Sequence, residues 1–121
     1  MATNIVYTAS ADLGNGAVFE AQGAAIFDAT AIVAADSVVI NVGFTPTYVC
    51  WENVTDRVKV EWYTGMAANS CIKTAAAGTR TLEVTGGNGG ITVAVGQFSV
   101  LQNATLAAIL ASKTCVWVAR G

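Results

Sequence analysis

The stretch TYVCWENVTDRVKVEWY, residues Thr47–Tyr63, decides the fold class of this chain. From residue 57 onward, the apolar side chains of Val58, Val60 and Trp62 alternate strictly with the charged ones of Arg57, Lys59 and Glu61. Because successive side chains of a β-strand point to opposite faces, this period of two predicts a strand with one buried and one wet face. Residues 47–54 predict a second strand, and the polar residues 53–56 predict the turn of a hairpin.

Similar alternation extends through most of the chain. An earlier strand is predicted where Val38, Ile40, Val42 and Phe44 share one face, and the only proline, Pro46, marks a corner after it. Further short strands are expected at residues 3–9, 69–74, 79–85, 91–95, 98–101 and 114–120, with strands joined by tight turns within 17–35. Turn signals every ~8 to 12 residues predict a mainly β fold, a single antiparallel β-sandwich or barrel of jelly-roll type over residues 1–121.

One short helix near residues 104–112 is expected as the exception. Asn103 or Thr105 can cap such a helix at its start. Leu106, Ile109 and Leu110 would share one apolar face of it.

The composition favours a protein that meets another subunit. Of the 121 residues, 54% are hydrophobic and 12% are charged, whereas about 25% are charged in an ordinary soluble domain. So few charges cover the surface of a domain poorly, and we expect some apolar surface to be buried in an assembly.

The six basic residues form no cluster, which argues against nucleic acid as a partner. No apolar run approaches the ~18 residues of a membrane span, so no membrane is expected.

The residue types of the chain also limit its chemistry. The chain has three cysteines, Cys50, Cys71 and Cys115, and this odd number at wide spacing does not make a disulfide framework. We interpret them as reduced and buried, with a reactive thiolate as the alternative. The chain contains no histidine, which removes the usual general base and the commonest metal ligand. We therefore expect no enzyme activity, no cofactor and no metal site. The start MATNIVY lacks the pattern of a secretory signal, so we expect the protein to stay in a cytoplasm.

Two further motifs have both a chemical and a structural interpretation. The run Gly86–Gly90 (GGNGG) is similar to phosphate-binding loops, but Ile91 begins a strand where those loops continue into Lys-Ser, Lys-Thr or a helix. We interpret the run as a hairpin connection that needs positive φ. Glu52 and Glu61 lie on facing strands, as a glycosidase pair would, but the neighbouring Arg57 and Lys59 favour ordinary cross-strand charge pairing.

The three tryptophans fall into two groups. Trp51 and Trp62 are in phase with the valines of their strands, which favours the core over a sugar-binding platform. Trp117 is out of phase with Val116 and Val118. If these valines face inward, Trp117 faces solvent or a partner, and we assign it to an assembly surface.

Four segments of the chain resemble small virion proteins of tailed bacteriophages. They are GFTPTYV (43–49), ENVTD (52–56), EWYTGM (61–66) and GGITV (89–93). The resemblance covers residues 43–95 and points to the capsid decoration or cement proteins found near the major capsid protein. Such proteins are compact β-rich domains that sit on the capsid lattice as trimers and clamp neighbouring capsomers. No catalytic residues come with the family.

The resemblance implies a structural protein of the capsid exterior, assembled in the cytoplasm of a bacterial host. Its expected partners are the major capsid protein and further copies of itself, in a homotrimer that stabilises the head shell by non-covalent contacts. A head-fibre or tail component of the virion is an alternative. The rival from a different class is a carbohydrate-binding β-sandwich module.

The predicted interface consists of Ile5, Tyr7, Phe19, Trp117 and Arg120. Ile5 and Tyr7 belong to a candidate N-terminal arm, residues 1–10, which would add a strand to the sheet edge of a neighbour. The alternative is that this segment is the first strand of its own sheet.

Overall fold

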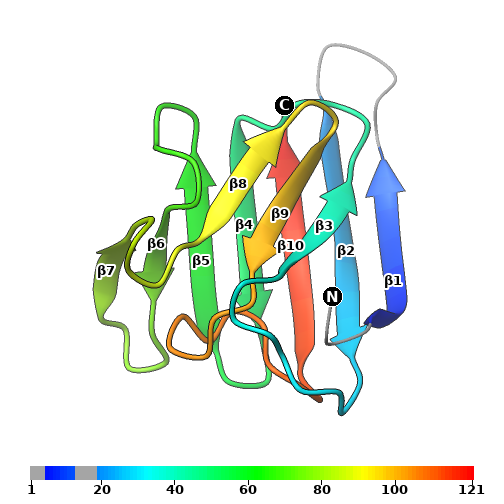
Figure 1. Cartoon of the computed structure of the whole chain (residues 1–121). Coiled ribbons are helices and arrows are strands. Elements are labelled where there is room, and N and C mark those ends of the chain that lie inside the picture. The colour runs from blue at the N-terminus through cyan, green and yellow to red at the C-terminus, as the bar shows by residue number, and fades with distance from the viewer. Residues whose placement is uncertain (1–4, 13–18) are drawn as a thin grey trace.

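The computed structural model describes residues 5–12 and 19–121, with side chains from residue 19 onward. These residues form ten β-strands in two antiparallel sheets that face each other (Figure 1). The strands are β1 (Ile5–Asp12), β2 (Glu20–Phe27), β3 (Ser37–Asn41), β4 (Tyr48–Asn53), β5 (Val58–Tyr63), β6 (Cys71–Thr74), β7 (Arg80–Glu83), β8 (Ile91–Ala94), β9 (Gln97–Leu101) and β10 (Thr114–Arg120). The predicted mainly β, antiparallel sandwich is confirmed.

The strand order places the last strand in the middle of the larger sheet. That sheet has seven strands in the order β1-β2-β10-β4-β5-β6-β7, and the small sheet has three in the order β3-β9-β8. The large sheet has β1 and β7 as open edges, so it does not close into a barrel. The division into seven and three strands also differs from the eight-stranded jelly roll.

The hairpin that decided the fold class forms as predicted. β4 and β5 pair from Tyr48↔Tyr63 to Asn53↔Val58. Trp51 and Trp62 point into the core, as do Val58 and Val60. The small sheet contributes Val38, Ile40, Phe98 and Val100 to the same core. Each large apolar side chain buried there stabilises the fold by about 1.5–3 kcal/mol.

Trp117 also lies in this core. Its side chain is 2% exposed, and its ring packs against Phe98 of the small sheet at 5.5 Å between centroids. The prediction that Trp117 faces solvent or a partner is therefore wrong. Trp117 is the register partner of Trp51, so both rings point inward, whereas Val116 faces out and is 39% exposed. A tryptophan buries more apolar area than a valine, which decides the orientation of a strand with two apolar faces.

Residues 103–112 form a loop, so the prediction of a helix at 104–112 is wrong. Asn103 does cap a turn, because its Oδ1 accepts hydrogen bonds from the backbone N–H groups of Thr105 and Leu106, both at 2.9 Å. The turn stops at Ala107, whose φ of 61° lies in the left-handed region.

Side chains of the large sheet take the carbonyl groups that a helix would need. Trp51 Nε1 donates to the carbonyl of Ala108 at 3.0 Å, and Lys73 Nζ donates to that of Thr105 at 2.7 Å. In a helix these carbonyls would instead accept from N–H groups four residues later. Tertiary contacts of the core thus replace local helical bonds in this segment.

The Gly86–Gly90 run connects the two sheets. Gly86 and Gly89 have φ values of 89° and 69°, so the predicted need for positive φ is confirmed. The strands on either side, β7 and β8, belong to different sheets, so the interpretation as a hairpin connection is wrong. Strand alternation alone does not tell whether the next strand pairs with its predecessor or crosses to the other sheet.

The first described segment pairs within its own chain. β1 runs antiparallel to β2, with Ile5 opposite Phe27 and Tyr7 opposite Ile26. The structure therefore favours the alternative of a first strand of its own sheet over a free arm, for residues 5–10. Residues 1–4 of the candidate arm, and the side chains of Ile5 and Tyr7, lie outside the described part of the structure.

Candidate functional site

The outer face of the small sheet carries no charged side chain on its strands. It consists of Ser37, Val39 and Asn41 of β3, Thr92 and Ala94 of β8, and Gln97, Ser99 and Leu101 of β9. We call these eight residues the neutral face. Val39 is 47% exposed on it, and Val95, at the tip of the β8–β9 hairpin beside it, is 90% exposed. Burying such a surface against a protein removes no ion from water.

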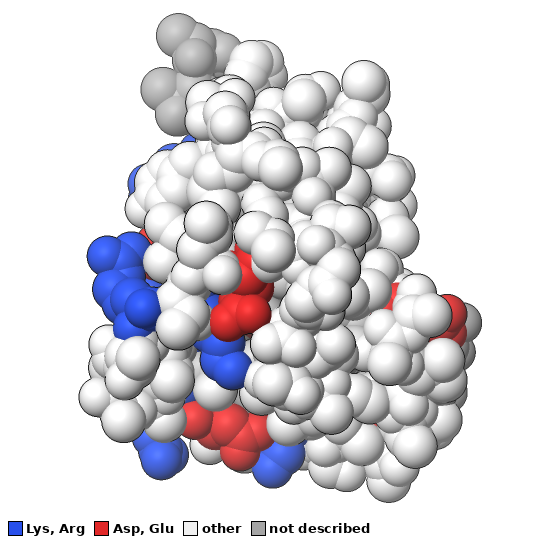
Figure 2. Space-filling model, turned by 60° about the vertical axis from the view of Figure 1, so that its left-hand side comes forward, with Lys and Arg blue, Asp and Glu red and all other residues white. Residues whose placement is uncertain are grey.

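Two uncharged stretches of the sequence produce this face. Residues 37–51 and 84–112 contain no Asp, Glu, Lys or Arg, and they include all three strands of the small sheet. In Figure 2, charged side chains lie mostly in the left and lower parts of the visible surface, with a few acidic ones at the right edge, whereas the upper part is nearly free of them. The overall fraction of charged residues does not locate the neutral face. The distribution of charge along the sequence does point to it.

The outer face of the large sheet is the charged one. The strand register places on it Glu20, Glu52, Lys59, Glu61, Arg80 and Arg120. Nearly half of the charged residues of the chain therefore lie on a single face, opposite the neutral one.

A second candidate surface lies where β10 ends, near the C-terminus in Figure 1, and it includes one end of the charged outer face of the large sheet. Phe19 stacks on Phe44 with ring centroids 5.8 Å apart, and Tyr48 packs against Tyr63 at 5.0 Å. The guanidinium of Arg120 lies 5.4 Å from the centre of the Tyr48 ring. We call these five residues the aromatic end. Aromatic and arginine side chains are enriched in protein interfaces and dominate their binding energy.

The strand register holds this surface together. Glu20, Arg120, Tyr48 and Tyr63 form one row across β2, β10, β4 and β5. Arg120 Nε donates to Glu20 Oε2 at 3.1 Å. The backbone N–H of Gly121 donates to the carbonyl of Phe19 at 2.9 Å, and that of Thr47 donates to the carbonyl of Arg120 at 2.7 Å. Tyr48, Tyr63 and Arg120 therefore lie on paired strands, and Phe19 lies directly before β2.

Glu61 fixes the two tyrosines of the aromatic end. The hydroxyl of Tyr48 donates to Glu61 Oε2 at 2.8 Å, and that of Tyr63 donates to the same oxygen at 3.4 Å. Burial, and then the hydrogen bond to Glu61, raises the pKa of Tyr48, so this hydroxyl stays protonated at neutral pH. Lys59 Nζ lies 3.9 Å from the other oxygen of Glu61, so this ion pair is within β5. Glu52 faces Lys59 across the hairpin in the strand register.

The five predicted interface residues do not form one surface. Phe19 and Arg120 both belong to the aromatic end, whereas Trp117 points into the core. Ile5 and Tyr7 lie opposite the far end of β2, away from Glu20, where β2 begins. Sequence reasoning missed Phe44, Tyr48 and Tyr63, since only strand register brings them together.

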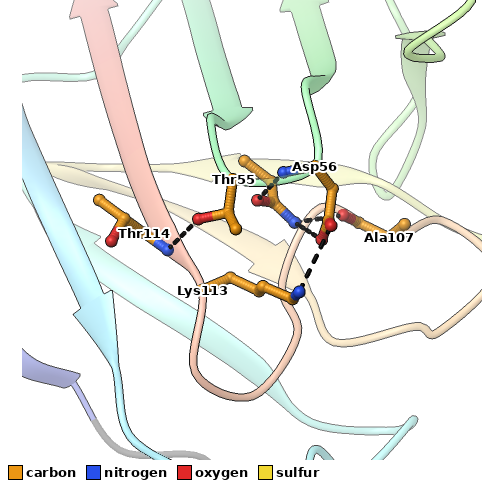
Figure 3. A network of polar contacts seen from close by, with 6 residues as sticks. Thr55, Asp56, Ala107, Lys113 and Thr114 are labelled. Carbon is orange, nitrogen blue, oxygen red and sulfur yellow. Dashed lines mark hydrogen bonds and ion pairs between the residues drawn. The ribbon is translucent and has the colours of Figure 1, made fainter.

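A polar network ties the β4–β5 turn to the loop before β10 (Figure 3). Asn53 is fully buried, and its Nδ2 donates to Asp56 Oδ2 at 2.9 Å and to the carbonyl of Ala107 at 3.1 Å. Its Oδ1 accepts from the backbone N–H of Asp56 at 3.1 Å. Lys113 Nζ lies 3.4 Å from Asp56 Oδ1. The network is a structural clamp at the end of the sandwich far from the aromatic end.

Replacing Asn53 by Ala is expected to lower the free energy of unfolding by about 2 kcal/mol or more. The change leaves the carbonyl of Ala107 without its donor and the N–H of Asp56 without its acceptor, and an unsatisfied buried group costs about 1–3 kcal/mol. Lys113→Ala is the matched control, because its ion pair with Asp56 is about one-third exposed and should contribute at most about 1 kcal/mol. Urea unfolding of both variants checks this, and equal losses would contradict the clamp.

The three cysteines are free thiols, and Cys71 and Cys115 are buried. Burial raises the pKa of each of these two thiols from 9.0 to about 12, and burial also raises the pKa of Cys50. None of the three has the lowered pKa of a reactive thiolate. Their geometry supports the interpretation as small buried hydrophobic residues for Cys71 and Cys115, whereas Cys50 is only half-buried opposite Glu61 on the outer face of the large sheet, so its predicted burial is wrong.

These raised pKa values predict a loss of stability at alkaline pH. The folded state keeps both thiols protonated where the unfolded chain ionises them, so the contribution is complete below pH 9.0 and is lost as the pH rises toward about 12. We expect the free energy of unfolding to fall between pH 9 and pH 10.5, and to fall less steeply in Cys115→Ala. Urea unfolding across this range checks the slope, and equal slopes in the two proteins would contradict it.

Comparisons with known proteins identify no relative of this chain. Neither a scan against protein families nor searches of curated proteins and of solved structures finds a match.

The described residues show neither a metal site nor a membrane-spanning helix. Within residues 5–12 and 19–121, no group of three or more Cys, Asp or Glu side chains is placed to hold a metal ion. In the same ranges, no helix has the length and apolar character needed to cross a membrane.

Proposed function

We propose that the protein is a structural subunit that self-associates and buries its charge-free side in an assembly. The neutral face carries this proposal, because the few charges of the chain lie elsewhere and the strands of this face offer only neutral side chains. Assembly surfaces of this kind are depleted of charge at their centre. The exposed Val39 and Val95 add apolar area that water does not favour.

More specifically, we propose that this structural subunit is a capsid decoration protein of a tailed bacteriophage. The protein would be a homotrimer that binds the major capsid protein on the exterior of the head and is assembled in the cytoplasm of the bacterial host. The resemblance of residues 43–95 to such proteins supports this form. Under the proposal the protein acts through non-covalent contacts and catalyses no reaction.

Assembly through an uncharged surface is expected to survive high salt. Screening weakens contacts between charges, and it leaves apolar and neutral contacts intact, between ~0.1 M and ~1 M ionic strength. Sedimentation velocity at both ionic strengths should give the same oligomer. Dissociation at high salt would contradict burial of the neutral face and favour the charged outer face of the large sheet.

The place in the virion is tested separately. On virions that contain this chain, an antibody raised against it is expected to label the outside of the heads in electron micrographs. Label confined to tails or fibres would overturn the decoration proposal and select the tail or head-fibre alternative.

The aromatic end favours carbohydrate binding as a second candidate function. Tyr63 is 43% exposed and packs against Tyr48, whose ring lies under the guanidinium of Arg120. A half-exposed ring near such a donor is the kind of platform on which sugars stack. The tryptophans do not provide it, because Trp51, Trp62 and Trp117 are all buried. Titration with a glycan library followed by calorimetry tests this function, and Tyr63→Ala should abolish any binding found.

A further inference from the structure

We propose that copies of this chain associate head to tail, with the aromatic end of one copy docked on the neutral face of the next. This inference rests on the proposed function, since it names the two surfaces through which the self-association occurs. The two surfaces lie on different sides of the molecule, one on the small sheet and the other where β10 ends (Figure 1).

The aromatic end has the properties of the inserting surface. Phe19 and Tyr63 are each 43% exposed, and the Arg120 side chain is 59% exposed. The rings are already held in the single chain, since Phe19 stacks on Phe44, and Tyr48 and Tyr63 pack together and donate hydrogen bonds to Glu61. Docking a pre-ordered surface loses little side-chain entropy.

The neutral face has the properties of the receiving surface. Its hydroxyl and amide groups, on Ser37, Asn41, Thr92, Gln97 and Ser99, supply hydrogen-bond acceptors for the guanidinium of Arg120 and for tyrosine hydroxyls. Val39 and Leu101 supply apolar contact for the phenylalanine rings.

The charges on the two surfaces also fit a second copy. The neutral face brings no ion into the contact, and the ions at the aromatic end have partners within their own chain, since Arg120 pairs with Glu20 at 3.1 Å and Glu61 accepts from two tyrosines. Docking the end on the rest of the charged outer face of the large sheet would instead bury side chains such as Glu52 and Arg80. A buried charge without a partner is costly, so the neutral face is the favoured receiver.

Contact between two different surfaces makes the interface heterologous. Such interfaces close into rings when the rotation between copies allows it, which is how a homotrimer forms. An interface between identical surfaces would instead give a two-fold dimer.

The test uses two single variants, each of which blocks one surface. Val39→Lys places a charge on the neutral face, and Phe19→Lys places one on the aromatic end. Leu82→Lys is the control, because Leu82 is 67% exposed on β7 and outside both surfaces. Thermal unfolding first establishes that all three variants fold, and light scattering then gives the mass of each alone and of the two blocking variants mixed.

The proposal predicts a distinct pattern of masses. Each blocking variant alone is a monomer, their equimolar mixture gives a dimer, and Leu82→Lys keeps the wild-type mass. The mixture dimerises because the intact end of Val39→Lys meets the intact face of Phe19→Lys. If one blocking variant keeps the wild-type mass, or if the mixture stays monomeric, head-to-tail docking is wrong while self-association stands. A monomeric wild-type protein would instead overturn the proposed function itself.

Discussion

Gly90→Ala is expected to lower the free energy of unfolding by about 3 kcal/mol, at the upper end of the usual loss from overpacking. A Cβ atom at Gly90 would lie 2.5 Å from the carbonyl carbon of Ser70, 2.7 Å from its oxygen and 2.8 Å from the backbone N of Cys71. These are backbone atoms at the start of β6 and in the residue before it, so no side-chain rotation can relieve the contact.

The backbone around Gly90 has little freedom to move. Its N–H donates to Asn69 Oδ1 at 3.0 Å, and its carbonyl accepts from the N–H of Leu101 at 3.0 Å. The next N–H, of Ile91, donates to the carbonyl of Ser70 at 3.1 Å and bridges the two sheets. Shifting Gly90 away from Ser70 therefore strains the junction at which β8 meets the large sheet.

Gly87→Ala is the matched control in the same loop. A Cβ atom there would meet only the carbonyl oxygen of Val84, at 3.4 Å, and Gly87 has no positive φ. The change should therefore alter the free energy of unfolding by no more than about 0.5 kcal/mol. Urea unfolding compares the two variants, and a mild effect of Gly90→Ala would show that the sheets do not meet as closely as described.

The second large effect is expected from a pair of tryptophan variants. Trp51 and Trp117 are 0% and 2% exposed, so Trp→Phe removes similar packing at both positions. Trp51 Nε1 donates to the carbonyl of Ala108 at 3.0 Å, whereas Trp117 Nε1 has no hydrogen-bond partner among the described residues. Trp51→Phe leaves a buried carbonyl short of its main donor, while Trp117→Phe removes a buried donor that is already unsatisfied.

Trp51→Phe should therefore be more destabilising than Trp117→Phe by about 2 kcal/mol, within the range for an unsatisfied buried group. Near-ultraviolet circular dichroism shows whether each variant keeps its core, and urea unfolding gives the difference. A Trp117→Phe variant as unstable as Trp51→Phe would mean that the indole N–H of Trp51 does not anchor the loop at residues 103–112.

The fold class followed from sequence because one face of most strands is buried. The period of two in residues 57–63 reflects a core on one side of β5, and the same reasoning located β3 and β4. It failed for β10, where both faces carry apolar residues and alternation does not say which one is buried. It also failed at residues 103–112, where the donors that replace helical bonds come from Trp51 and Lys73, distant in sequence.

The candidate surfaces were only partly predictable. The neutral face is visible in the sequence as two stretches without charge, once the strands at 37–41, 91–94 and 97–101 are assigned to one sheet. The predicted β4–β5 hairpin already pairs Tyr48 with Tyr63. Phe19 and Arg120 join them only because β10 enters between β2 and β4. Pairings between distant strands leave no local signal in a single sequence.

The mass of the protein in solution tests the central claim most directly. Light scattering behind a sizing column, at several protein concentrations, is expected to give a stable species of about three times 12.4 kDa. A mass of 12.4 kDa at every concentration would contradict the account, because the neutral face would then stay exposed to water in the isolated protein.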